Sequence, residues 1–300
     1  MANTMKAQVF YDAENMKLED VPIPEVGDTD VLVKVKSVGI CGSDISYYYG
    51  LSPVDTPTGK GPIVLGHEFT GVVDKVGKVP QALGLFKEGD RVVVNPVQFC
   101  NACYSCAEGK THFCENMNVS GVSYDGAFAE YALANYTGLF KLPDDVSFSE
   151  GAFTEPLACV VNAFKKADME PGSFVIVAGP GPMGQMMVQL AKSMGAGKVV
   201  LTGTRDYMLE LGKAHGADYV FNVRDKNSKY YAADLKKEIA DLTEGKLADR
   251  AFVPTSSNAA FEEAIDLVGN CGILIHFGLP NADDVIHVPA LSFHTMDKEI

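Results

Sequence analysis

The feature that most constrains the fold is the stretch Phe174–Gly184, where a short apolar run leads into three spaced glycines. A strand, a glycine turn and a helix in this order suit a dinucleotide pyrophosphate, because the glycines permit a tight turn, close approach of the backbone and close helix–strand packing. The helix N-terminus then offers unpaired N–H groups to the phosphates. The stretch therefore predicts a nucleotide site rather than an ordinary glycine-rich turn. Its predicted cofactor-binding residues are Gly179, Gly181, Pro182, Met183 and Gly184.

The pattern of the chain changes near residue 152, which predicts two domains, 1–152 and 153–300. In the first, short β-type runs separated by Gly and Pro predict an antiparallel, barrel-like β domain. In the second, helical and strand patterns alternate, which predicts a doubly wound parallel sheet of five strands. We expect strands in the first domain at 6–11, 31–38, 70–76, 91–94 and 127–133. In the second domain we expect strands at 174–178, 198–202, 219–223, 250–253 and 272–278, and helices near 155–166, 183–194, 207–215, 230–242 and 258–268.

The composition excludes several classes of function. The formal net charge of −14 argues against a nucleic-acid or anionic-membrane partner. No apolar run approaches the roughly 20 residues that a membrane-spanning helix needs. The first residues lack the pattern of a secretory signal, so we expect a cytoplasmic protein. Its seven cysteines are then expected to be metal ligands or free thiols rather than disulfides.

Four of these cysteines form a dense cluster, Cys100-x-x-Cys103-x-x-Cys106 followed by Cys114. Gaps of two residues let successive thiolates converge on one ion, and four thiolates suit a closed structural zinc site. An iron–sulfur site is disfavoured, because bacterial ferredoxins have three residues and then a final Cys-Pro, whereas here the last gap is longer and Glu115 follows. We expect this lobe, about 95–116, to hold its loop in place and to take no part in chemistry.

A second set of candidate ligands is scattered along the chain: Cys41, His67, Glu68 and Glu155. Individually each has a plain alternative, since a lone cysteine is usually a small buried apolar residue and a lone histidine is usually just hydrogen-bonded. Together, one Cys, one His and one carboxylate make up the three ligands of a catalytic zinc with an open fourth position. Spacing in the sequence does not establish that they meet.

The motifs of this chain resemble those of the zinc-dependent medium-chain alcohol dehydrogenases, and especially the polyol branch that includes sorbitol dehydrogenase. The resemblance implies a GroES-like β domain joined to a Rossmann domain, with the active site in the cleft. It also implies a small-molecule alcohol or polyol substrate and a homodimer or homotetramer. The motifs, in the order of the family, are Cys41-Gly-Ser-Asp44, Gly66-His-Glu68, the four-cysteine lobe, Asp125-Gly-Ala-Phe-Ala-Glu-Tyr131, Glu155-Pro-Leu157 and Gly179–Gly184.

The resemblance also implies roles for single residues. Cys41, His67 and a carboxylate would bind the catalytic zinc, with either Glu68 or Glu155 as the direct ligand and the other acting through water or in support. The zinc would lower the pKa of the alcohol, which passes hydride to NAD(P). Ser43 is implied as the first hydroxyl of a proton relay. Many relatives carry histidine three residues later, where this chain has Ser46, so we expect the proton to leave by another route or through water.

The choice of nicotinamide depends on the residue that ends the second strand of the dinucleotide domain. An acidic residue there would bind the ribose 2′-OH of NAD(H). This chain instead has Gly203, followed by Thr204 and Arg205. The missing carboxylate removes repulsion, and a guanidinium can bind a 2′-phosphate, so we expect NADP(H) to be favoured over NAD(H). The alternative is a solvated Arg205, with Asp206 taking part of the acidic role.

Chains of the resembled family usually run some tens of residues further. We expect a sixth parallel strand to begin near Lys298–Ile300, and the sequence to be either a truncated piece or a form that lost its tail. The predicted function is a zinc-dependent alcohol or polyol dehydrogenase with one catalytic and one structural zinc. The alternative is a non-catalytic NAD(P)-binding relative, or an inactive truncated form with a structural or sensing role. The presence of Ser43 and of the full ligand set favours the enzyme.

Overall fold

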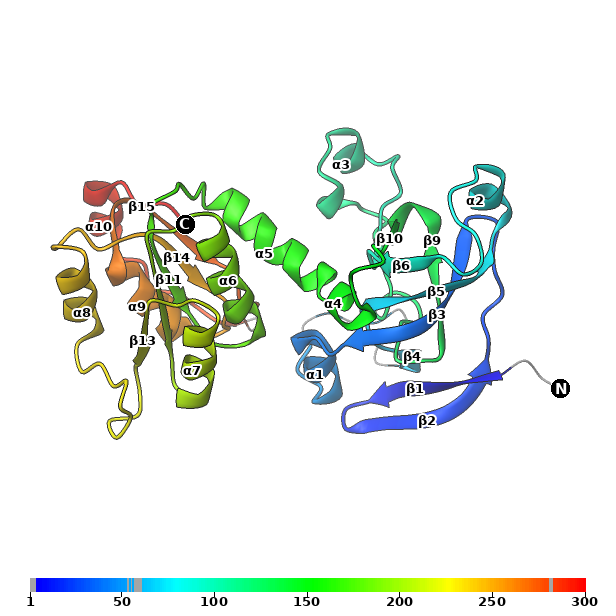
Figure 1. Cartoon of the computed structure of the whole chain (residues 1–300), viewed down its shortest axis with the longest axis horizontal. Helices are drawn as coiled ribbons and strands as arrows, with labels where there is room; N and C mark the ends of the chain where they lie inside the picture. Colours follow the sequence, from blue (N-terminus) through cyan, green and yellow to red (C-terminus); the bar gives the residue numbers. More distant parts are fainter. Residues whose placement is uncertain (1–3, 53, 55, 57–60, 281–282) are drawn as a thin grey trace. The chain divides into compact units, whose positions relative to one another are not determined.

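The computed structural model describes residues 4–52, 54, 56, 61–280 and 283–300, and it divides into two compact units, Met1–Pro156 and Leu157–Ile300 (Figure 1). This division lies four residues beyond the domain boundary predicted from the sequence. Within the described residues, no helix combines the length and the apolar character that a membrane span requires.

The first unit is built mainly from antiparallel strands, as predicted. A five-stranded sheet has the order β10-β6-β5-β3-β9, a three-stranded sheet has the order β2-β1-β4, and β7 pairs with β8. Apolar side chains of the larger sheet, among them Val33, Phe69 and Val92, form its core. The strands are β1 (Thr4–Asp12), β2 (Asn15–Pro22), β3 (Asp30–Gly39), β4 (Ile63–Val64), β5 (Glu68–Val76), β6 (Arg91–Val94), β7 (Val97–Gln98), β8 (Asn118–Val119), β9 (Tyr131–Asn135) and β10 (Leu139–Lys141).

Short helices connect the strands of this unit. The α-helices are α1 (Gly42–Tyr48), α2 (Lys78–Ala82), α3 (Tyr104–Ala107) and α4 (Phe148–Ala152), and the 3-10 helices are η1 (Thr111–Phe113) and η2 (Tyr136–Gly138). The strand predicted at 127–133 is wrong in its first half. Residues Ala127 and Phe128 instead donate backbone hydrogen bonds to the segment before His67, and the strand begins at Tyr131.

The second unit is a five-stranded parallel sheet of order β13-β12-β11-β14-β15, which confirms the doubly wound prediction. Its strands are β11 (Phe174–Ala178), β12 (Lys198–Gly203), β13 (Tyr219–Asn222), β14 (Ala248–Val253) and β15 (Val268–His276). Its helices are α5 (Thr154–Lys166), which begins in the first unit, α6 (Pro182–Ser193), α7 (Asp206–Ala214), α8 (Leu235–Leu242), α9 (Asn258–Leu267) and α10 (Ala290–Met296).

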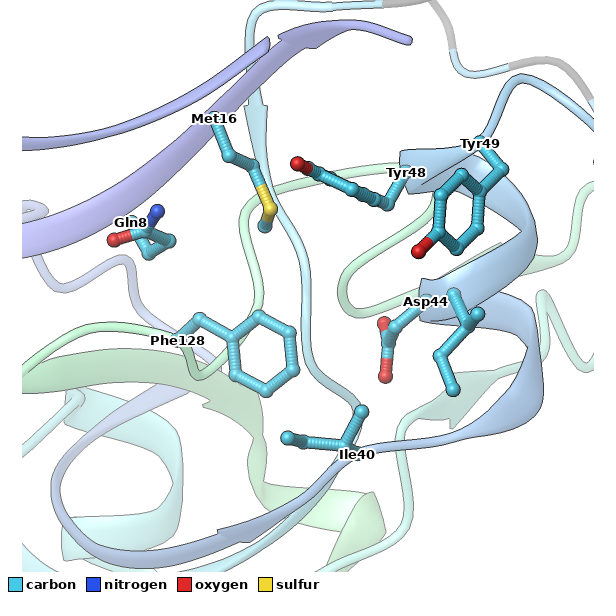
Figure 2. Close-up of a pocket in the computed structure, with 8 residues that line it drawn as sticks. Gln8, Met16, Ile40, Asp44, Tyr48, Tyr49 and Phe128 are labelled. Carbon is cyan, nitrogen blue, oxygen red and sulfur yellow. The ribbon is translucent and has the colours of Figure 1, made fainter. Parts of the chain in front are cut away.

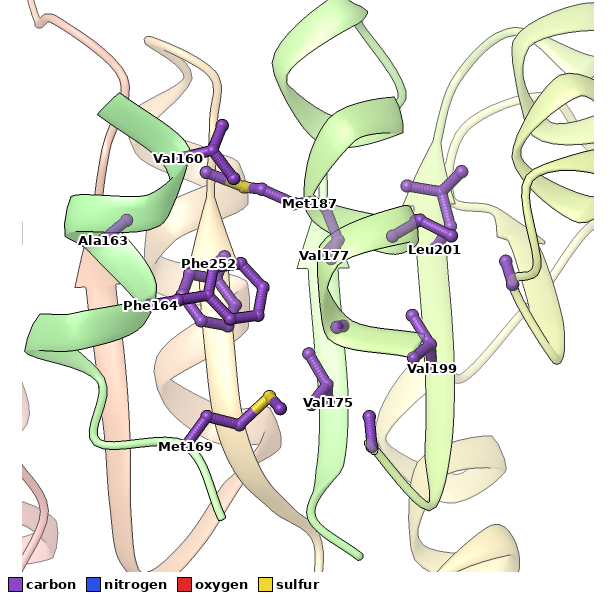
Figure 3. Close-up of a cluster of buried hydrophobic side chains, with 14 of the residues drawn as sticks. Val160, Ala163, Phe164, Met169, Val175, Val177, Met187, Val199, Leu201 and Phe252 are labelled. Atoms are coloured by element: carbon purple, nitrogen blue, oxygen red, sulfur yellow. The ribbon is translucent and has the colours of Figure 1, made fainter. Parts of the chain in front are cut away.

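Alternate residues of β11 enter two different cores. Val175 and Val177 pack with residues of α5, α6 and α7, whereas Ile176 packs with residues of α8 and α9. Side chains of a strand point alternately to its two faces, so these helices cover opposite faces of the sheet. In the first core, the rings of Phe164 and Phe252 stack with centroids 4.2 Å apart (Figure 3).

Two elements of the second unit begin four or more residues away from their predicted starts. Helix α8 begins at Leu235 rather than Tyr230, because the side chain of Asp234 accepts a hydrogen bond from the Lys237 N–H and caps the helix. Strand β15 begins at Val268, four residues early, since the chain turns directly from α9 into pairing with β14. Near the end of the sequence, Glu299 forms a parallel bridge with Ile273 of β15, where a further strand was expected to begin.

Candidate active site

Antiparallel pairing of β3 with β5 brings together ligands that are far apart in the sequence. The last residue of β3, Gly39, is the register partner of Glu68, the first residue of β5. Cys41 follows β3 by two residues and His67 directly precedes β5. One ligand atom each of Cys41, His67 and Glu68 therefore lies within 4.8 Å of the others. A thiolate, an imidazole and a carboxylate at this separation fit a zinc ion and leave its fourth position open.

Asp44 connects the two loops that carry these ligands. Its Oδ2 accepts a hydrogen bond from the Cys41 N–H at 2.8 Å, and its Oδ1 accepts one from the Gly66 N–H at 3.3 Å. The same Oδ1 lies 3.8 Å from Nδ1 of His67, a buried nitrogen that has no hydrogen-bond partner among the described residues. A carboxylate beside a ligand imidazole orients the ring and raises its basicity. The sequence analysis quoted Asp44 within a motif but gave it no role.

The electrostatics of this cluster favour a cation. Burial opposes a charge on His67, yet a hydrogen bond with Cys41 and the charges of Asp44, Cys41 and Glu155 raise the pKa of His67 to about 9. Burial also raises the pKa of Glu68, against the opposing effects of Cys41 and His67. Negative groups that hold a proton on a buried imidazole can equally hold a dication.

Glu155 and Ser43 lie near the cluster but outside the group of three. Glu155 is half-buried in the first turn of α5, and burial raises the pKa of its carboxyl while the charge of His67 lowers it. Ser43 is half-buried in α1. In the same helix, the hydroxyl of Ser46 donates to the Gly42 carbonyl at 3.0 Å, so its proton is already engaged by the backbone.

The segment Asp125–Phe128 forms hydrogen bonds with the residues that precede His67. A carboxylate oxygen of Asp125 accepts from the Val64 N–H at 2.9 Å, the Gly126 N–H donates to the Val64 carbonyl at 2.7 Å, and the Ala127 N–H donates to the Gly66 carbonyl at 2.8 Å. A Cβ on Gly126 would overlap the carbonyl of Gly66. The Asp-Gly-Ala-Phe motif thus positions the residue before His67, a role that only the tertiary pairing reveals.

A mostly apolar cavity of about 550 Å³ is lined in part by Asp44 and Phe128, which both form hydrogen bonds with the segment before His67 (Figure 2). It is lined by Ile40, Ile45, Tyr48, Tyr49, Phe128 and the carboxyl-bearing Asp44, together with Gln8 and Met16. The adjacent Tyr47 does not line it; its ring is buried and packs edge-on against Phe10 with centroids 6.1 Å apart.

The four-cysteine cluster also assembles in the first unit. Its sulfurs all lie within 4.8 Å of one another. The distances from Cys100 Sγ to Cys106 Sγ and from Cys103 Sγ to Cys114 Sγ are both 4.0 Å. These distances are too long for a disulfide and close to the roughly 3.8 Å sulfur–sulfur edge that Zn–S bonds of about 2.3 Å give in a tetrahedron.

The pKa values of two of these cysteines are strongly shifted. Backbone N–H groups of Ala102 and Cys103 lower the pKa of Cys100 to about 6, because they stabilise its thiolate. Burial and the neighbouring sulfurs raise the pKa of Cys106 to about 12. Four sulfurs at this separation are typical zinc ligands, so Cys100, Cys103, Cys106 and Cys114 fit a structural zinc.

The glycine turn of the second unit has the predicted geometry. Gly179 has a φ of 143°, and a Cβ on Gly184 would overlap the Gly179 carbonyl, so both positions need glycine. A Cβ on Gly181 would meet no described atom within 4 Å. Pro182 is the first residue of α6, where a missing N–H costs nothing, and Met183 follows it. The backbone at Gly181 is therefore open to a phosphate at the start of the helix.

Directly after β12, an exposed cation is followed by an acid that is engaged in internal hydrogen bonds. Thr204 and Arg205 are exposed, and the guanidinium of Arg205 lies 5.8 Å from the ring centroid of Tyr207. Asp206 is instead bound internally, since its Oδ1 accepts hydrogen bonds from Asn222 Nδ2 and Ser228 Oγ, both at 2.7 Å. These bonds lower the pKa of Asp206 and hold its carboxylate in place.

Comparison with known protein families gives two matches along the chain. Residues 27–144 match the alcohol dehydrogenase GroES-like domain, and residues 182–299 match the zinc-binding dehydrogenase domain. The sorbitol dehydrogenase of Bacillus subtilis (strain 168) is 33% identical over 295 residues, which is 98% of this chain and 80% of that protein. The chain belongs to the zinc-binding alcohol dehydrogenase family.

Other proteins are similar to this chain in sequence and in fold. The probable D-xylulose reductase A of Aspergillus clavatus is 38% identical over 97% of this chain and 80% of that protein. A Sinorhizobium meliloti protein crystallised with NADP superposes with a TM-score of 0.90 at 28% identity, over 99% of this chain and 83% of that one. A short chain alcohol dehydrogenase of E. coli CFT073, in complex with NADH, gives a TM-score of 0.87 at 29% identity, over 99% and 82%. Membership confirms the predicted GroES-like and Rossmann domains and supports zinc and a nicotinamide as cofactors.

Proposed function

We propose that this chain transfers hydride between a polyol, or another secondary alcohol, and NADP(H), with zinc bound by Cys41, His67 and Glu68. The observation that carries the proposal is the convergence of these three side chains within 4.8 Å. The relatives named for sorbitol and D-xylulose support a polyol substrate. A spectrophotometric screen of NADP+ and NAD+ against polyols, threonine, sugar phosphates and simple secondary alcohols tests it. The proposal would be contradicted if the zinc-loaded protein turned over none of these alcohols with either nucleotide.

The mechanism assigns separate tasks to the residues of the site. Zinc, when bound, acts as a Lewis acid that lowers the pKa of the substrate hydroxyl. Asp44 fixes the Cys41 and Gly66 backbones and faces the ring of His67. Ser43 accepts the hydroxyl proton while it passes its own proton to water, and Glu155 supports the site through water. The hydroxyl of Ser46 does not extend this relay, because it already donates its proton to the Gly42 carbonyl. Gly179, Gly181, Pro182, Met183 and Gly184 hold the nucleotide pyrophosphate.

The alternative of a non-catalytic, structural or sensing relative is not supported, because the similar proteins are named as a sorbitol dehydrogenase and a D-xylulose reductase. Zinc content tests the same distinction. A scaffold needs only the four-cysteine site, whereas the proposed enzyme holds two zinc ions per chain. We propose a homodimer or homotetramer on the family resemblance, and a cytoplasmic location on the sequence of the first residues.

We expect Cys103→Ser to lower the zinc content from two ions per chain to about one, since three sulfurs bind zinc far more weakly than four. The lobe that contains α3 should then be cut more readily by proteases, because the sulfurs link it to the rest of the loop. Elemental analysis and limited proteolysis measure the two effects. Cys271→Ser removes an exposed cysteine outside both clusters and should keep both ions. Two ions in Cys103→Ser would refute the structural site.

We also expect Arg205→Ala to weaken NADP+ binding by about 10- to 100-fold with little change for NAD+, because a charge-assisted hydrogen bond contributes about 1.5–3 kcal/mol. Support comes from the exposed guanidinium and from the internal hydrogen bonds of Asp206. The ratio of kcat/KM for the two nucleotides measures the effect. Lys246→Ala, an exposed cation before the amino end of β14, serves as the control. A strong NAD+ preference of the unaltered protein would defeat the NADP(H) assignment.

A further inference from the structure

Gln185 is a buried amide that the proposed chemistry does not use. It directly follows Gly184 in α6 and is only 5% exposed. Its Nε2 donates to the carbonyls of Pro180 and Met208, both at 2.9 Å, and its Oε1 lies 3.0 Å from Nδ1 of His215. Both ends of the side chain are therefore engaged. A buried amide bound in this way is fixed in position, because each lost partner would leave a costly unsatisfied group.

The partners of Gln185 belong to two separate segments of the proposed cofactor site. Pro180 lies in the glycine turn, between Gly179 and Gly181. Met208 lies in the first turn of α7, and His215 directly follows the last residue of that helix. A single side chain thus links the turn expected to receive the pyrophosphate to both ends of the helix that Arg205 precedes.

Close packing at two glycines strengthens the same connection. A Cβ on Gly203 would overlap the ring of Pro180, so the glycine turn lies directly on the end of β12. A Cβ on Gly212 would overlap Leu201 of β12, which shows how closely α7 approaches that strand beside Gln185. The glycine turn, the end of β12 and α7 therefore pack closely together. Gln185 forms the hydrogen bonds that join the turn to α7.

We propose that Gln185 is a positioning residue for the cofactor: it fixes the glycine turn relative to the start of α7, so that pyrophosphate and 2′-phosphate are bound together. This inference rests on the proposed preference for NADP(H). A dinucleotide phosphate contacts both segments at once, and a loose connection between two anchor points costs affinity for a ligand that needs both. NAD(H) lacks the 2′-phosphate, so its binding depends less on where α7 begins.

A double-mutant cycle in the full-length protein tests the proposal. Dissociation constants of NADP+ and NAD+ are measured by calorimetry for the unaltered chain, Gln185→Leu, Arg205→Ala and the double variant. We expect Gln185→Leu to weaken NADP+ by about tenfold and NAD+ by clearly less. The effects on NADP+ should also be non-additive, with the double variant little worse than Arg205→Ala, because Gln185 acts through the placement of Arg205. A purely structural role predicts equal losses for both nucleotides and additive effects.

Two further variants keep the result interpretable. Gln189→Leu alters an exposed glutamine one turn further along α6, and it should bind both nucleotides as the unaltered chain does. If Gln185→Leu does not fold, Gln185→Met, which keeps the length of the side chain, replaces it in the cycle. An unchanged ratio of the two dissociation constants, or additive effects, would overturn the positioning role alone. Failure of the unaltered chain to prefer NADP+ would instead overturn the proposed cofactor.

Discussion

Cys41→Ala should lower kcat/KM for the alcohol by at least about 1,000-fold and remove one of two zinc ions. A zinc ion held by Cys41, His67 and Glu68 would contribute several kcal/mol of charge stabilisation to the reaction, and each 1.4 kcal/mol corresponds to a factor of ten in rate. The residual pair of His67 and Glu68 would bind the ion too weakly to keep it. Initial rates and elemental analysis on the same preparation measure the two effects together.

The control for this variant is Cys271→Ala, which alters an exposed thiol outside both clusters. It should retain activity and both ions. Nucleotide binding should persist in Cys41→Ala, because the glycine turn belongs to the other unit. A Cys41→Ala protein that keeps full activity would remove the basis of the dehydrogenase mechanism, whatever its fold.

Gly181→Ala should weaken the binding of either nucleotide by at least about 100-fold, because a methyl group would occupy the place where the backbone meets the phosphates. The ligand-free protein should change little, since the added Cβ meets no described atom within 4 Å and the φ of Gly181 is −68°. Loss of a glycine N-cap costs at most about 1 kcal/mol, which corresponds to a fall in Tm of about 2–4 °C. Calorimetric titration and thermal melts separate the two quantities.

Gly184→Ala gives the contrasting case. Its Cβ would overlap the carbonyl of Gly179, so this variant should lose stability even without nucleotide. The prediction for Gly181 is wrong if Gly181→Ala binds NADP+ and NAD+ as tightly as the unaltered chain does. It is also wrong if both variants destabilise the ligand-free protein equally.

The sequence predicted best those elements whose signal is local. The run Phe174–Ala178 is the observed β11 residue for residue, because every one of its side chains is buried in a parallel sheet. The four cysteines are close in sequence, so their convergence followed from spacing. Strand β2 was missed because all of its residues are exposed or half-buried and show no apolar run.

The sequence alone could not predict the parts of the site that depend on pairing between distant segments. The meeting of Cys41 with His67 follows from the register that pairs Gly39 with Glu68, which spacing alone does not fix. Asp44 and Gly126 looked like ordinary members of motifs, and only their contacts with the Gly66 backbone give them roles. Family resemblance supplied the ligand set, whereas the structure supplied the reason that these residues meet.

The hydrogen bonds of Asp44 predict how the first unit would bind and release the proposed zinc. Both carboxylate oxygens bind backbone N–H groups of the two ligand-bearing loops, and they do so through protein contacts alone. The loops are thereby preorganised, and capture of an ion costs little additional chain entropy. Chelation should then empty this site reversibly and without unfolding, so that metal exchange is a local event governed by the concentration of free zinc.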